Sequence, residues 1–208
     1  MYKRQADTAK LLRTRGQAMQ EAVPVGEGAM AALLGLGIDT VRGLVEDAAG
    51  SEVCAAANDN DPAQVVISGH KAAVERAVDA AKAAGAKRAL MLPVSAPFHC
   101  SLMEPAAAVM AGALEAVDIQ EPAVPLVANV RAEAVVNPGL IRGLLVEQVT
   151  GAVRWRESVG FMAENGVTQF WEIGAGKALS GMIRRIAKDT EVSAFGTAQQ
   201  IQDVSEKL

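Results

Sequence analysis

The stretch "QVVISGHKAAVERAVDAAKAAGAKRALMLPVS", Gln64 to Ser95, has the clearest pattern of secondary structure in the sequence. It opens with a short apolar run rich in β-branched residues, which is typical of a buried strand. The next sixteen residues, 70–85, place their apolar side chains three and four positions apart and end in Gly85, a pattern that predicts a helix with a glycine stop. A second apolar run, 86–95, follows. The stretch therefore predicts a strand, a helix and a strand.

The preceding residues repeat this arrangement. The run AMAALLGL, 29–36, predicts a buried strand, and IDTVRGLVEDAAG, 38–50, predicts a helix with Asp39 or Thr40 as its N-cap. A short strand, VCAAAND, then meets the first strand of the quoted stretch across NDNDP, which we interpret as a turn. The order over residues 28–95 is β-α-β-β-α-β, the ferredoxin-like pattern.

Outside this module the chain predicts further helices and three strands. A helix is expected over 6–22, and another from Ser101 onward, with Pro105 tolerated in its first turn. The expected strands are VPLVANV, TQFWEIG and VSAFG, and the remaining helices cover 138–151, 155–166 and 178–188. Strands that alternate with helices predict a mainly parallel sheet. Three strands make a small sheet for so many helices, so this part looks like an incomplete domain.

The composition excludes several classes of protein. The 208 residues are 50% apolar and 21% charged, with a net charge of −4, which argues against nucleic acid or an anionic membrane as the main partner. No apolar run is long enough to span a bilayer. Two cysteines, Cys54 and Cys100, form neither a disulfide framework nor a metal cluster, so we expect a cytoplasmic protein without a metal or a cofactor.

His99 is the candidate catalytic residue that position alone suggests. It lies in "LPVSAPFHCSLMEPAA", 92–107, at a strand-to-helix junction, where α/β proteins tend to place their sites. A neutral imidazole there could accept a proton, although lone histidines are often structural. His70 is interpreted as an exposed residue at a helix start. Cys100 is interpreted as a buried small residue, because neighbouring side chains point apart and a Cys–His pair rarely forms between them.

Two other motifs, GAGK and DNDP, suggest a chemistry that the residues around them do not support. The turn GAGK, 174–177, lacks the first glycine and the trailing Ser or Thr of a nucleotide-binding loop, so a tight turn is favoured. The run DNDP lacks carboxylates at calcium-loop spacing. No serine stands in a G-x-S-x-G nucleophile elbow. Arg15 has the planar guanidinium that suits a carboxylate, but its spacing alone indicates only a solvated helical arginine.

Five motifs in order resemble the malonyl-CoA:acyl-carrier-protein transacylases of fatty-acid synthesis. These are RGQAMQEAVPVGEGAMAALLGL, NDNDPAQVVISG, LPVSAPFHCSLMEPA, LVEQVTGAVRW and EIGAGKALSGMIRR. The resemblance implies an α/β-hydrolase-like acyltransferase large domain with a ferredoxin-like insert. Residues 1–26 and 96–208 would belong to the large domain, here incomplete, and residues 27–95 would form the small one. Malonyl-CoA and acyl carrier protein are then the substrates, and the full-length protein is expected to be a monomer.

The resemblance also implies the roles of particular residues. His99 matches the general base, and Gln148 matches the residue whose main-chain carbonyl orients that base. Arg15 matches the arginine that pairs with the free carboxylate of malonyl. Phe98 matches a position where related domains that select malonyl carry phenylalanine, whose bulk would crowd an α-methyl branch. Positions near the site are matched by Asn58, Asn60 and Gln64.

The chain departs from the family pattern in one decisive respect. The elbow G-H-S-x-G with its nucleophilic serine has no counterpart here, and neither does the early Gly-Gln loop of the oxyanion hole. We therefore expect a fragment of a malonyl transferase that is inactive alone. The alternatives are a noncatalytic protein that binds acyl-CoA or carrier protein, and an unrelated ferredoxin-like sensor domain. A basic patch of Arg184, Arg185 and Lys188, with Lys87 and Arg88, is the candidate docking surface for an acidic carrier protein.

Overall fold

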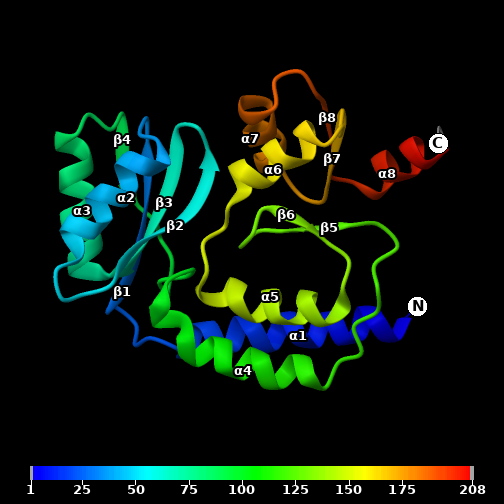
Figure 1. Ribbon diagram of the computed structural model, residues 1–208, viewed down its shortest axis with the longest axis horizontal. Helices are drawn as coiled ribbons and strands as arrows, with labels where there is room; N and C mark the ends of the chain where they lie inside the picture. The colour runs from blue at the N-terminus through cyan, green and yellow to red at the C-terminus, as the bar shows by residue number, and fades with distance from the viewer. Residues whose placement is uncertain (1, 207–208) are drawn as a thin grey trace.

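The computed structural model describes residues 2–206 and arranges them as three groups of elements (Figure 1). A four-stranded sheet with two helices stands at one end of the molecule. Three helices lie beside one another along its lower edge in Figure 1, and the C-terminal helices and short strands lie above them. Among the residues described, no helix has the length and apolar character needed to cross a membrane.

The four-stranded sheet confirms the predicted β-α-β-β-α-β order. Its strands run antiparallel in the order β2-β3-β1-β4. They are β1 (Gly28–Leu34), β2 (Cys54–Asp61), β3 (Gln64–His70) and β4 (Arg88–Met91), and one face is covered by α2 (Ile38–Ala49) and α3 (Lys71–Ala83). Ala31 and Leu33 of β1 are fully buried towards these helices, while Met30 packs on the opposite face. Burial of both faces explains why β1 is continuously apolar.

Two sequence expectations for this module are wrong in detail. The acidic run interpreted as a turn belongs to β2, which continues through Asp61 with irregular register, and the chain reverses only at residues 62 and 63. The carboxylate of Asp61 accepts a hydrogen bond from the N–H of Ala63 at 2.9 Å, which closes this tight turn. The N-cap of α2 is Gly37, with no side-chain cap, rather than Asp39 or Thr40.

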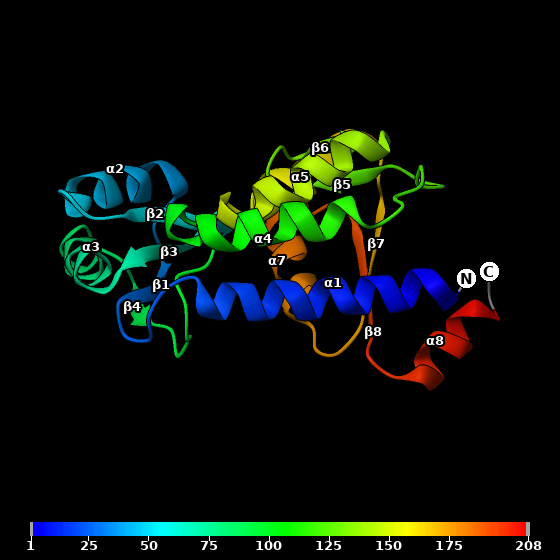
Figure 2. The ribbon, with the colours of Figure 1, turned by 90° about the horizontal axis from the view of Figure 1, so that it is seen from below.

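The three helices along the lower edge share one core. They are α1 (Tyr2–Glu21), α4 (Glu104–Glu115), which follows a single 3₁₀ turn η1 (Ser101–Met103), and α5 (Pro138–Thr150). Figure 2 shows α1 and α4 running side by side. Met103, Leu114 and Val149 are buried between the helices, so the first and fourth predicted helices meet although they are far apart in sequence. The predicted helix after Ser101 is confirmed, with its proline in the first turn.

The mainly parallel sheet predicted from three strands is wrong, because residues 2–206 divide these strands between two small sheets. β7 (Gln169–Ile173) and β8 (Glu191–Phe195) pair in parallel, whereas β5 (Leu126–Ala128) forms an antiparallel hairpin with an unpredicted strand, β6 (Glu133–Val135). The turn of this hairpin includes Ala132 at a φ of 54°. The helices here are α6 (Trp155–Glu164), α7 (Ala178–Ile186) and α8 (Ala198–Ser205), and α8 was not predicted although Thr197 and Gln200 form a capping box.

Candidate active site

The backbone around His99 is held in place from both sides. Pro97 is fully buried and packs so closely on Gly28 that a Cβ on that glycine would lie 2.4 Å from the proline ring. The thiol of Cys100 donates to the carbonyl of Pro97 at 3.2 Å. His99 itself adopts a φ of 60°, a left-handed conformation that costs a residue other than glycine about 1–3 kcal/mol. The surrounding packing maintains this strained conformation.

The imidazole of His99 meets two carbonyl groups at the end of α5. Its Nδ1 lies 3.0 Å from the main-chain oxygen of Gln148 and 3.1 Å from that of Gly151. Carbonyl oxygens only accept hydrogen bonds, so the proton of the neutral ring must reside on Nδ1. The lone pair is therefore on Nε2, where it can accept a proton from a substrate or a nucleophile.

The surroundings keep this ring neutral near pH 7. Burial lowers the pKa of His99 below its ordinary value of 6.5, and the positive charge of Arg15 acts in the same direction. The hydrogen bonds to the two carbonyls oppose both effects but do not outweigh them. A neutral imidazole with a free Nε2 has the properties of a general base.

Arg15 lies on α1 at the wall of a groove of about 500 Å³ between α1, α4 and α5. Most of the lining is apolar, including Leu11, Met110 and Leu114, while Gln148 contributes a polar edge. The guanidinium is half-buried, and burial lowers its pKa, although an arginine keeps its charge in any case. None of the ion pairs found among residues 2–206 involves Arg15. Its planar fork is therefore available to a carboxylate.

The structure brings some of the other predicted residues to this site. Phe98 is half-buried and packs between the core of the three helices and the open face of the sheet. Asn58 on β2 forms a β-bridge with Val153, two residues after Gly151. Gln64 pairs with Leu34, at the end of the sheet opposite the packed Gly28, about 20 Å away at the usual rise of a strand. Asn60 lies between Asn58 and Gln64 on the same hairpin, and the roles of all three residues stay predictions.

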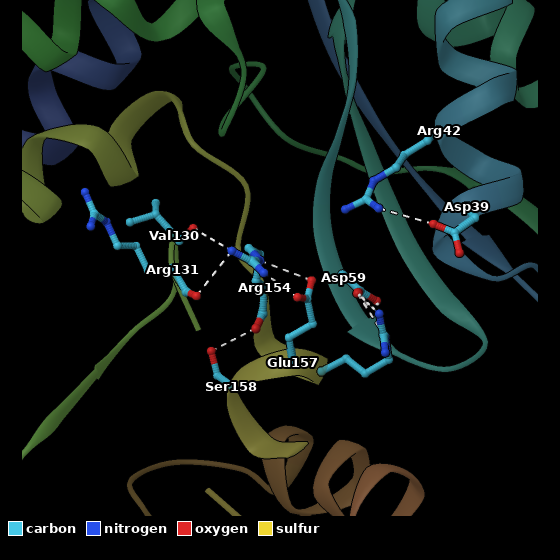
Figure 3. A network of polar contacts seen from close by, with 9 residues as sticks. Asp39, Arg42, Asp59, Val130, Arg131, Arg154, Glu157 and Ser158 are labelled. Carbon is cyan, nitrogen blue, oxygen red and sulfur yellow. Dashed lines mark hydrogen bonds and ion pairs between the residues drawn. The ribbon is translucent and has the colours of Figure 1, made fainter. Parts of the chain in front are cut away.

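Sequence reasoning missed the junction between β2 and residues 151–157. Gly151 is a second acceptor for His99, and a Cβ there would lie 2.8 Å from Val130, so the close approach requires glycine. Figure 3 shows the polar contacts around Arg154, whose guanidinium pairs with Glu157 and donates to the carbonyls of Val130 and Arg131 at 3.2 Å. Acidic residues inside an apolar strand were the available signal, and interpretation of NDND as a turn concealed it.

Cys100 and the GAGK segment have structural roles. Cys100 is buried, and burial raises the pKa of its thiol, which agrees with its interpretation as a small core residue. The GAGK segment is a turn with Gly174 and Gly176 at positive φ. Glu172 accepts hydrogen bonds from the N–H of Leu179 and of Ser180 at 3.2 and 2.7 Å, so a carboxylate already occupies the N-terminus of α7.

Two expectations about surface residues are wrong. His70 lies at the start of a helix as predicted, as the N-cap of α3, but it is not exposed, because it also ends β3 and its Nδ1 accepts a hydrogen bond from the N–H of Val53 at 2.8 Å. The predicted basic patch is not one surface. Arg185 is paired with Asp61 at 2.7 Å, which neutralises it. Lys87 and Arg88 lie at the β4 edge of the sheet, whereas α7, which carries Arg185, contacts the opposite edge at β2.

The chain belongs to the acyl transferase domain family, whose model matches residues 4–204. Within this family, its relatives are malonyl transferases. It is 49% identical over 190 residues to the malonyl CoA-acyl carrier protein transacylase of Escherichia coli K12, a match that spans 91% of this chain and 62% of the relative. The resemblance found in the sequence is therefore confirmed.

Solved structures agree with this assignment and with the acyltransferase fold. The acyl-carrier-protein-S-malonyltransferase of Bartonella henselae superimposes with a TM-score of 0.93 at 52% identity, over 97% of this chain and 64% of that one. A second match, at 44% identity and a TM-score of 0.90 over 95% of this chain and 64% of that one, is the malonyl-transacylase PlMCAT in complex with its type II PKS acyl-carrier protein AntF. The chain thus spans a little less than two thirds of the length of these relatives.

Proposed function

We propose that these residues carry the general base and the carboxylate-binding arginine of a malonyl-CoA:acyl-carrier-protein transacylase of fatty-acid synthesis. The observation that carries the proposal is the neutral His99, its Nδ1 bonded to two carbonyls, with the guanidinium of Arg15 close enough to influence its pKa. The relatives named above support malonyl-CoA and acyl carrier protein as the substrates.

His99 would act twice in a ping-pong reaction. Its Nε2 takes the proton of a serine hydroxyl as the serine oxygen attacks the malonyl thioester carbonyl. The tetrahedral intermediate then collapses, the bond to the coenzyme A sulfur breaks, and that sulfur takes the proton from the imidazolium. In the second half His99 deprotonates the phosphopantetheine thiol, whose sulfur attacks the malonyl ester, and the proton returns to the serine. The Gln148 carbonyl keeps the other nitrogen protonated throughout, as an aspartate does in serine proteases.

Arg15 would select the acyl group. A malonyl carboxylate can form two parallel hydrogen bonds with the guanidinium, whereas the methyl group of an acetyl substrate leaves that half-buried charge without a partner. Phe98 would add a second discrimination by crowding an α-methyl branch, an effect worth about 1–3 kcal/mol.

The nucleophile of this reaction is not identified among the 208 residues, because none of their serines stands in a G-x-S-x-G elbow. We propose that the serine belongs to a part of the parent protein outside this sequence, and that the 208 residues alone are inactive. The parent would be a cytoplasmic monomer. Residues 27–95 would be its ferredoxin-like insert, and residues 1–26 and 96–208 parts of the large domain; the separate cores of the sheet and of the α1, α4 and α5 layer support this division.

A chimera tests the proposal directly. In the Escherichia coli relative, the matched segment is replaced by the corresponding residues of this chain, and transfer from malonyl-CoA to holo acyl carrier protein is measured. The chimera should be active. His99→Ala should lower kcat/KM by about 10²–10⁴-fold, as expected for loss of a general base, while His70→Ala serves as the matched control.

The selectivity is measured in the same chimera. Arg15→Ala should lower kcat/KM for malonyl-CoA by about 10–150-fold, the equivalent of a hydrogen bond to a charged group, and should leave acetyl-CoA little changed. An active His99→Ala chimera would contradict the role of the base. Saturable binding of malonyl-CoA by the 208-residue chain, together with an inactive chimera, would favour the noncatalytic alternative.

A further inference from the structure

The edge strand β2 forms a continuous contact with the loop that carries one of the acceptors of His99. The N–H of Val153 donates to the carbonyl of Ala57 at 2.8 Å, and the N–H of Asp59 donates to the carbonyl of Val153 at 2.9 Å. Val153 therefore bonds to Ala57 and Asp59, the residues before and after Asn58, as a residue of a fifth strand beside β2 would. Because Gly151 is only two residues away, the position of its carbonyl depends on this pairing.

An ion pair joins the same two segments: Arg156, three residues after Val153, pairs with Asp59. Arg156 donates from Nε to the two carboxylate oxygens of Asp59 at 3.1 and 2.9 Å, and its Nη2 lies 2.8 Å from Oδ2. The Asp59 side chain is only 4% exposed, whereas that of Arg156 is 32% exposed. Figure 3 shows Asp59 on its strand reaching the start of α6, where Arg154 and Glu157 also lie. The fork-like geometry gives this pair directional specificity beyond that of a simple charge contact.

The junction connects the two parts of the molecule that together hold the imidazole. His99 is carried by the segment that leaves the sheet, anchored by the contact of Pro97 with Gly28. Its acceptors, at Gln148 and Gly151, belong to the end of α5 and the loop beyond it. A shift of the sheet against this loop would therefore separate the ring from its acceptors.

We infer that Asp59 is a positioning residue which, through Arg156 and Val153, holds the Gly151 carbonyl against Nδ1 of His99. The inference deepens the proposed function, on which it rests for the role of His99 as the base. Asp59 touches neither the substrate nor the reacting atoms in this arrangement. Its effect is to maintain the tautomer that leaves Nε2 free.

The chain offers a matched control on the same strand. Asp61 is as buried as Asp59 and also pairs with an arginine, Arg185, whose Nε and Nη2 lie 2.8 and 2.7 Å from its Oδ2. Arg185 belongs to α7, which lies well beyond the 151–156 segment in sequence. Loss of the Asp61 pair should therefore disturb the structure to a similar extent without moving the acceptors of His99.

The test is nuclear magnetic resonance of the 208-residue chain labelled with ¹⁵N-histidine, at about pH 8, above the ordinary pKa of histidine. The two histidines should be in opposite tautomers. His99 should carry its proton on Nδ1, and His70 should carry it on Nε2, because its Nδ1 accepts a bond from Val53. Asp59→Asn should shift the Nδ1–H signal of His99 and raise the share of the Nε2–H form, because the Gly151 acceptor is displaced while the Gln148 carbonyl stays in place. Asp61→Asn should leave both rings as in the wild type.

The outcomes separate positioning from folding and from function. If Asp59→Asn does not fold, the double variant Asp59→Asn/Arg156→Gln removes both charges, leaves no unpaired ion, and should show the same change in the His99 signal. A folded Asp59 variant whose His99 signal and share of the Nε2–H form equal those of the wild type would overturn the inference, as would an equal change in Asp61→Asn. The readout uses no activity, so failure of the transacylase chimera would overturn the proposed function while leaving the positioning result intact.

Discussion

The contact between Gly28 and Pro97 makes a quantitative prediction about stability. A Cβ added at Gly28 would lie 2.4 Å from both Cδ and Cγ of the proline, so the ring would have to retreat by about 1 Å to reach ordinary van der Waals contact. Pro97 is fully buried, and the close packing of protein interiors resists such a movement. Overpacking of this kind costs about 1–3 kcal/mol. Gly28→Ala should lower the free energy of unfolding by that amount.

Substitution of a second glycine, Gly43, is expected to change the free energy of unfolding in the opposite direction. Gly43 lies in the middle of α2, and a Cβ there would meet nothing within 4 Å. Gly43→Ala should therefore raise the free energy of unfolding by about 0.5–1 kcal/mol, because alanine loses less conformational entropy in a helix. The two substitutions add the same methyl group and differ only in what surrounds it.

The assay is urea denaturation of the 208-residue chain, followed by circular dichroism. Because Pro97 adjoins His99, the Gly28→Ala chain should also show a displaced ¹⁵N signal for that ring, whereas Gly43→Ala should not. A Gly28→Ala chain with the wild-type unfolding midpoint would refute the packing argument. A Gly43→Ala chain less stable than the wild type would show that the surroundings of this helix had been misjudged.

Two further predictions concern titration and the N-terminus of α7. Since the folded-state pKa of His99 lies below 6.5, the unfolded chain binds a proton that the folded chain does not as the pH falls from 6.5 to that lower pKa. The free energy of unfolding should fall as the pH is lowered through this window, and it should fall less in the His99→Gln chain. If urea titrations show the same dependence of this free energy on pH for both chains, the depressed pKa of His99 is contradicted. Ser180→Ala removes the 2.6 Å hydrogen bond from the buried hydroxyl to Glu172 and should cost about 1 kcal/mol in the same urea assay, whereas no change would mean that the backbone N–H groups alone hold that carboxylate.

The sequence predicts the module over residues 28–95 well because its signals are local. Each strand is a short apolar run, each helix repeats its apolar residues at helical spacing, and glycines at 50 and 85 adopt the positive φ values that end the helices. The pairing of the four strands then follows, because a β-α-β-β-α-β order is typical of the ferredoxin-like sheet. The site was predicted through resemblance, since His99 and Arg15 are separated by more than eighty residues and no periodicity connects them.

The sequence alone predicts the helices from α1 to α7, most of the strands and the residues matched to the family, but not α8. The tertiary structure was needed to show that Asp59 and Asp61 of β2 are buried partners of arginines. Asp59 and Arg156 are 97 positions apart and Asp61 and Arg185 are 124 apart. A carboxylate that follows an apolar run can lie in a turn and face solvent, or lie in the strand and face a buried arginine. The local sequence does not distinguish the two arrangements. The choice is made by the segment that packs against the strand edge, because a buried charge is tolerated only where that segment brings its counter-charge.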